Sequence, residues 1–268
     1  MRRAAWALVF VLGACTNRVG EGDTPADPTA NPLGNGTRVR DVQNPANGNA
    51  GKTFDMTAVT VLAVDQYDET GDGKSRGTIW VQDFGSTDPF SGVSLYSPVL
   101  VPASLRLAPG DVVDLSGQYA EVTALGTNRF AAGTFLPQIV TPTTKLRFEG
   151  PVPTPKEIDL DDLNKFETGR RWIGMLVVVK DVYAATAVIL DPASNRGSVT
   201  LTKNGGGGPV TSASAPTISN ELTPLTADTV SKGAKLASVT GVVTFFATSR
   251  AINFHIAPRN GADIKIQP

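Results

Sequence analysis

The feature that most constrains the fold is a series of short segments in which apolar and polar residues alternate. The first half of the chain holds four of them, at residues 57–67, 77–83, 91–97 and 110–122, and a weaker one at 135–140. A period of two residues places one apolar face of a strand against a core. The stretches between them, such as DETGDGKSRG and GSTDPF, have turn-forming compositions. Five short strands at this spacing predict a small β-barrel or sandwich.

The second half of the chain repeats this pattern. Its strand-like segments are WIGMLVVVKDVYA, AVILD, GSVTLT, KLASVTGVVTFFA and RAINFHI. GDVVDLSGQY in the first half and AKLASVTGVV in the second each carry a glycine near the middle, which suits a strand that coils sharply around a small closed barrel. The sequence therefore predicts barrels at residues 52–142 and 156–268. A proline-containing linker is expected at 143–155, and a short helix leads the second barrel at 156–166.

Five segments of the sequence share a resemblance to known domains. They are GTIWVQDFGSTDPFSGVSLYS, LAPGDVVDLSGQYAEV, GMLVVVKDV, SVTGVVTFF and the final APRNGADIKI. These segments resemble the OB-fold domains found beside secreted bacterial nuclease or phosphatase modules. The resemblance implies an all-β chain with two tandem OB-like, five-stranded Greek-key barrels. No nuclease or phosphatase module follows the second barrel in the sequence. We therefore expect a binding or scaffolding protein without cofactors, and not an enzyme.

The N-terminus has the pattern of an export signal. Arg2 and Arg3 precede an uncharged run, and the residues LGAC at 12–15 resemble the bacterial lipobox. This resemblance implies a signal peptide at 1–14, a diacylglyceryl group on Cys15 and further acylation such as palmitate at the new terminus. A plain secretory signal is the alternative. Thr16 after Cys15, where Asp would signal retention, implies the outer membrane of a Gram-negative cell envelope. Residues 15–51 are rich in Gly, Pro, Asp and Asn, so we expect a flexible tether there, with 39–45 as an edge strand.

The alternation also predicts a binding surface. If Ile79, Val81, Val93 and Leu95 fill the first barrel, then Trp80, Gln82 and Tyr96 lie on its outer face. Strands two and three of an OB barrel form its usual ligand surface. Trp80, Gln82 and Tyr96 are therefore candidate binding residues for an envelope protein or a glycan. The alternative is that the aromatic residues pack against the second domain or the linker.

Other candidate chemistry is weaker. Asp65, Asp68 and Asp72 could form a calcium site, but an ordinary acidic hairpin is the favoured interpretation, because Ile79 stands where an EF-hand needs Glu. His255 is the single histidine, and we expect it to point outward into solvent. We interpret Asp159, Asp161 and Asp162 as first-turn residues of a helix.

The net charge of the chain argues against nucleic-acid binding. Without Arg2 and Arg3, 22 basic residues face 25 acidic ones, whereas binding to phosphates needs a basic surface. An extracytoplasmic nucleic-acid-binding protein is therefore the alternative to the favoured hypothesis, which is a lipid-anchored protein that binds a protein or glycan through its barrel surfaces.

Overall fold

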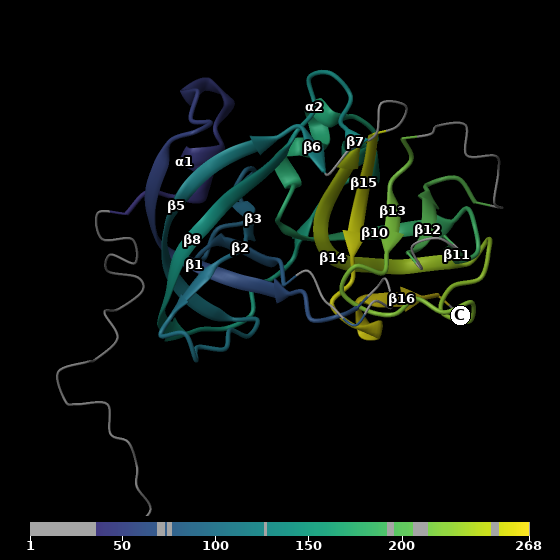
Figure 1. Ribbon diagram of the computed structural model, residues 1–268. Helices are drawn as coiled ribbons and strands as arrows, with labels where there is room; N and C mark the ends of the chain where they lie inside the picture. Colours follow the sequence, from purple (N-terminus) through teal and green to yellow (C-terminus); the bar gives the residue numbers. More distant parts are fainter. Residues whose placement is uncertain are drawn as a thin grey trace, which may run out of the picture. The chain divides into compact units, whose positions relative to one another are not determined.

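Strand pairing organises the described part of the chain around two β-sheets (Figure 1). The computed structural model describes residues 36–68, 73, 77–125, 128–191, 196–205, 214–247 and 252–267. One sheet has 6 strands and the other has 8, with a further 2-stranded hairpin. The prediction of an all-β chain is confirmed. Cys15 and the predicted signal peptide lie outside the described residues.

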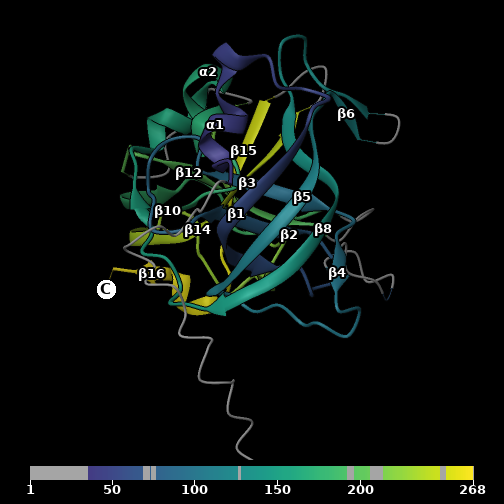
Figure 2. The same cartoon turned by 90° about the vertical axis from the view of Figure 1, so that its left-hand side faces the viewer.

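The first sheet closes on itself through five strands. These are β1 (Thr53–Val64), β2 (Ile79–Asp83), β3 (Gly92–Tyr96), β5 (Asp111–Val122) and β8 (Leu136–Glu149). They pair in the order β3-β2-β1-β5-β8, and a parallel pairing between β3 and β8 completes the cycle. The short strand β4 (Val99–Val101) continues from β3 and pairs in parallel with the later part of β8 (Figure 2). A small hairpin, β6 (Ala124–Leu125) and β7 (Asn128–Arg129), lies between β5 and β8 in the sequence.

The second sheet repeats the same five-strand order. Its cycle consists of β10 (Leu176–Ala184), β12 (Gly197–Thr202), β13 (Thr217–Ser219), β14 (Lys235–Ala247) and β15 (Ile252–Ala257), and the parallel pairing of β13 with β15 closes it. Three short strands are added to it, namely β9 (Lys156–Glu157) beside β10, β11 (Ile189–Leu190) beside β12 and β16 (Ile264–Ile266) beside β14. A 3-10 turn, η4 (Gly261–Asp263), precedes β16. The internal repeat predicted from the sequence therefore corresponds to a repeated topology. One strand prediction of the second half is wrong, because the segment at 187–191 forms β11 outside the cycle, and the third strand of the cycle is β13.

Each cycle surrounds an apolar core, and Phe130, from the segment between β7 and β8, packs in the core of the second cycle. Ile79, Val81, Val93 and Leu95 belong to the core of the first cycle, as the alternation predicted. Phe254 and Ile256 lie in the core of the second. Alternate residues of the strands thus fill the two interiors, and the others form the outer faces that concern function.

The two predicted mid-strand glycines, Gly117 and Gly241, lie in equivalent strands of the two cycles, β5 and β14. A Cβ on Gly117 would come within 2.6 Å of Ile139 Cγ2 on the neighbouring β8. A Cβ on Gly241 would come within 2.5 Å of the Ala257 carbonyl oxygen on β15. Both contacts are far closer than real Cβ atoms tolerate, so glycine allows the close approach of β5 to β8 and of β14 to β15.

The predicted elements and boundaries need four corrections. The tether prediction for 15–51 is wrong from Thr37 onward, because Thr37 bridges Met56 and a helix and a 3-10 turn follow, α1 (Val39–Gln43) and η1 (Pro45–Asn47). The expected edge strand at 39–45 is therefore helical, with Val39 and Val42 buried. The linker is shorter than predicted, since β8 extends to Glu149. The expected helix at 156–166 is instead β9 followed by η2 (Leu160–Asn164), α2 (Phe166–Gly169) and η3 (Arg170–Trp172).

Candidate functional site

Two of the three predicted binding residues are buried. Trp80 is 7% exposed and packs with Leu62 and Ala63 of β1 and with Leu176 and Val242 of the second sheet. Gln82 is fully buried, and its Oε1 accepts a hydrogen bond of 3.1 Å from the backbone N–H of Leu176. The prediction that Trp80 and Gln82 bind an external ligand is therefore wrong. The alternative that the aromatic face packs against the second domain holds for Trp80.

Trp80 and Gln82 belong to a tight contact that we call the joint, formed with Gly92 of the first barrel and Gly174 and Leu176 of the second. A Cβ on Gly92 would lie 2.4 Å from the Gly174 carbonyl carbon, so the two backbones touch directly. Gly174 has φ of +79°, a conformation that glycine adopts without strain. The outer face of β2 and β3, where OB barrels usually bind ligands, is thus used for this contact.

Tyr96 is the predicted binding residue that remains exposed. Its side chain is 55% exposed, and Val99 and Val101 of β4 are 54% and 39% exposed. Leu100 packs against the first core, so alternation turns Val99 and Val101 outward. We call Tyr96, Val99 and Val101 the Tyr96 surface. Within the described part of the chain β4 pairs with β8 alone, and Pro98 and Pro102 flank it.

The flanking prolines limit how a partner can use this surface. Proline has no backbone N–H to donate, and short strands with proline are a common protection against strand addition at a sheet edge. An added β-strand would therefore find few backbone hydrogen bonds along β4. The outward side chains remain as the recognition features of the Tyr96 surface.

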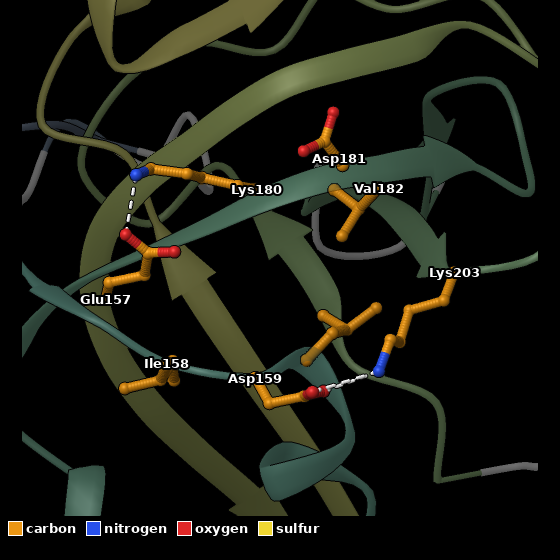
Figure 3. Close-up of a pocket in the computed structure, with 8 residues that line it drawn as sticks. Glu157, Ile158, Asp159, Lys180, Asp181, Val182 and Lys203 are labelled. Carbon is orange, nitrogen blue, oxygen red and sulfur yellow. Dashed lines mark hydrogen bonds and ion pairs between the residues drawn. The ribbon is translucent and has the colours of Figure 1, made fainter.

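A pocket of about 380 Å³ lies on the second barrel, lined by Glu157, Ile158, Asp159, Leu160, Lys180, Asp181, Val182 and Lys203 (Figure 3). Two ion pairs cross its rim: Lys180 Nζ lies 2.5 Å from Glu157 Oε2, and Lys203 Nζ lies 2.9 Å from Asp159 Oδ1. Lys203 also reaches Asp161 at 2.9 Å.

The ion pair of Lys203 with Asp159 shifts the pKa values of both groups, and the ion pairs together leave the pocket little net charge. The hydrogen bond from Lys203, together with one from the Asp161 backbone, lowers the pKa of the Asp159 carboxyl. The same contact raises the pKa of Lys203. Asp159 caps η2, as its predicted place at the start of a helix requires. Both lysines of the pocket are paired with its carboxylates, and Asp181 pairs with Lys235 outside the pocket, so the pocket offers a ligand little net charge. We infer that the two lysine pairs hold β9 and η2 against the barrel.

His255 has a partner that the sequence did not reveal. Its Nδ1 lies 3.2 Å from Glu221 Oε1, and its side chain is 19% exposed. The expected outward direction is correct, but the expected solvent exposure is not. Glu221 is 34 residues away in sequence, and it comes close because it follows β13, which pairs in parallel with β15. Thr217 and Thr244 pair with His255 from the two neighbouring strands. No spacing rule in the sequence would have found this contact.

The acidic hairpin contains no metal site among the described residues. Asp65 is buried, and its backbone N–H donates to the Thr78 carbonyl. Asp68 Oδ2 accepts a hydrogen bond of 2.7 Å from Gly73 N–H, as an ordinary turn residue does. Asp72 lies outside the described residues. No group of three or more His, Cys, Asp or Glu side chains within the described ranges is arranged to hold a metal ion.

Comparisons with known proteins do not assign a family. No family model matches the chain, and no curated protein matches it.

None of the helices in the described part of the chain is long and apolar enough to cross a membrane.

Proposed function

We propose that the chain is a lipid-anchored protein of the bacterial cell envelope that binds another protein through the Tyr96 surface. In this proposal the two barrels are OB-type barrels without catalytic activity, and acylated Cys15 attaches them to the membrane. Two or more acyl chains give stable attachment where one does not. The exposure of Tyr96, Val99 and Val101 is the observation that carries the binding role.

The chemistry of this surface favours a protein partner. Tyr96, Val99 and Val101 expose one aromatic ring with a hydroxyl and two apolar side chains. Tyrosine is enriched among the residues that dominate protein–protein binding. Glycan sites also use aromatic residues, but they need polar side chains converging beside the ring. The two residues that follow Tyr96 on this surface are both valines.

Nucleic-acid binding receives less support. The usual ligand face of an OB barrel is the outer side of strands two and three, and in the first barrel Trp80 and Gln82 of that face are buried in the joint. The acidic net charge of the chain is also unfavourable for contact with phosphates.

The binding proposal is tested by cross-linking in intact cells followed by purification of the chain. Tyr96→Ala combined with Val99→Asp should reduce recovery of a specific partner at least about tenfold, the effect of losing a central tyrosine contact. Ile189→Ala combined with Leu190→Ala is the matched control, since these residues form a similarly exposed apolar pair on β11. Equal recovery with both double variants, at equal melting temperatures, would contradict the proposed surface.

The anchor is tested separately. Mass spectrometry of the mature N-terminal peptide should show a diacylglyceryl modification on Cys15, and Cys15→Ser should move the protein from the membrane fraction to the soluble fraction. An unmodified Cys15 in purified protein would contradict the lipid anchor and would leave the test of the Tyr96 surface unaffected.

A further inference from the structure

The helix α1 is too short to be stable alone and depends on groups outside it. A five-residue helix is well below the length at which isolated helices persist in water. The buried Asp83 carboxylate accepts hydrogen bonds from the backbone N–H groups of Val39 at 2.7 Å and Arg40 at 3.1 Å. At the other end, Asn49 Nδ2 donates to the Val42 carbonyl at 3.0 Å. We call residues 37–49 the strap.

The strap holds the loop between β2 and β3, residues 84–91. The buried Gln43 side chain donates through Nε2 to the carbonyl oxygens of Phe90, at 3.3 Å, and Gly92. Arg40 Nη1 lies 2.5 Å from Asp88 Oδ2 in the same loop. Asp83 directly precedes the loop, so the strap contacts the loop region at its beginning, middle and end.

The same loop also contacts the second barrel. The backbone N–H of Phe90 donates to the Arg171 carbonyl at 2.7 Å. The Arg170 guanidinium carbon lies 5.7 Å from the centre of the Phe90 ring, within the range of a cation–π interaction. Phe90 thus accepts from Gln43 through its carbonyl group and donates to the second barrel through its amide. Gly92, which also accepts from Gln43, is the residue in backbone contact with Gly174.

We infer that the strap is a clamp that holds the two barrels together at the joint. It acts through the loop: Gln43 fixes the positions of Phe90 and Gly92, and these two residues contact Arg171 and Gly174. When Gln43 no longer donates, the carbonyl groups of Phe90 and Gly92 lose this donor, the loop loosens, and the joint opens, while Val39 and Val42 of the strap stay in the core of the first barrel.

Hydrogen exchange of backbone amides in the full-length protein tests this inference. The amide of Phe90 donates to Arg171 and the amide of Leu176 donates to Gln82, so both report on the joint. In Gln43→Ala we expect both amides to exchange at least about tenfold faster, because the buried Gly92 carbonyl group and the partly buried Phe90 carbonyl group both lose this donor. Amides of β14 and β15 should keep their wild-type rates. Arg40→Ala, at a more exposed contact, should give a smaller change in the same direction.

The control is Gln118→Ala, which removes another glutamine side chain that donates to a backbone carbonyl, that of Gly51, away from the loop. It should leave the Phe90 and Leu176 amides unchanged. Faster exchange at Phe90 without a change at Leu176 would show that the strap braces only the loop and would overturn the inference. Unchanged rates at both amides, or faster exchange throughout the first barrel in Gln43→Ala, would overturn it as well.

Discussion

Asp83 makes the stability of the first barrel depend on pH in an unusual direction. Desolvation by burial is the largest influence on its carboxyl group and raises the pKa from 3.8 to about 6, although the hydrogen bonds from Val39 and Arg40 partly oppose it. A carboxyl whose pKa is higher in the folded state stabilises that state when it is protonated. The stabilisation is complete below about pH 3.8 and is lost as the pH rises through about 6.

The size of the effect on the free energy of unfolding follows from the size of the pKa shift of Asp83. Each pKa unit corresponds to about 1.4 kcal/mol, so a shift from 3.8 to about 6 amounts to about 3 kcal/mol over the full titration. Between about pH 4 and pH 7 the larger part of this, about 2 kcal/mol, should be lost. Other groups titrate in the same range, so the quantity to measure is a difference between two proteins.

The assay is urea unfolding of the wild type and Asp83→Asn at several pH values. Asparagine does not titrate, so the free energy of unfolding of the wild type minus that of the variant should fall by about 2 kcal/mol from about pH 4 to pH 7. Asp88→Asn is a control on the same loop, because Asp88 is exposed and its ion pair with Arg40 contributes little. A difference that stays constant with pH, or rises with it, would refute the reasoning that burial dominates at Asp83.

Two further predictions concern the joint and its surroundings. Gly174→Ala should reduce the free energy of unfolding by about 3 kcal/mol, because its φ is positive and the new Cβ would lie 2.5 Å from Val93 N. Gly133→Ala is the control, since Gly133 has a φ of +81° with open space around it, and it should cost only about 1 kcal/mol. Equal losses of the two variants in chemical denaturation would contradict the close contact at Gly174. Asp162→Asn should cost about 2 kcal/mol by the same measurement, since Asp162 accepts from Trp172 Nε1 at 3.1 Å and pairs with Arg171 at 2.9 Å. Asp161→Asn, at an exposed pair with Lys203, should change stability by less than about 1 kcal/mol, and a loss as large as that of Asp162→Asn would argue against this ranking.

Periodicity in the sequence predicted the long strands and their inward faces, but it missed β13, which is only three residues long and closes the second cycle. Ile79, Val81, Val93 and Leu95 alternate with polar or aromatic neighbours, and alternation is a local property that directly reflects which side of a strand is buried. The glycines of β5 and β14 were also recognisable, because a residue without Cβ in the middle of a long strand indicates a close approach of a neighbouring strand.

The use of the outer faces could not be predicted in this way. Alternation places Trp80, Gln82 and Tyr96 on one outer face, but it does not say that the second barrel covers the first two and leaves Tyr96 exposed. That outcome depends on contacts such as Gln82 with Leu176, which are 94 residues apart. The strap was missed for a related reason. Its composition is polar and rich in turn-forming residues, and its helix forms because distant groups, above all Asp83, satisfy its backbone.

The position of the tryptophans gives the molecule an intrinsic optical probe. The sequence contains 3 tryptophans, Trp6, Trp80 and Trp172, and the first falls within the predicted signal peptide. Trp80 packs within the joint, and Trp172 directly follows Arg171, whose carbonyl receives the Phe90 amide. In a processed chain the ultraviolet fluorescence would therefore come from one tryptophan at the contact between the barrels, Trp80, and one in the core of the second barrel, Trp172. The wavelength and quenching of the Trp80 emission would record separation of the barrels, and those of Trp172 would record unfolding of the second barrel.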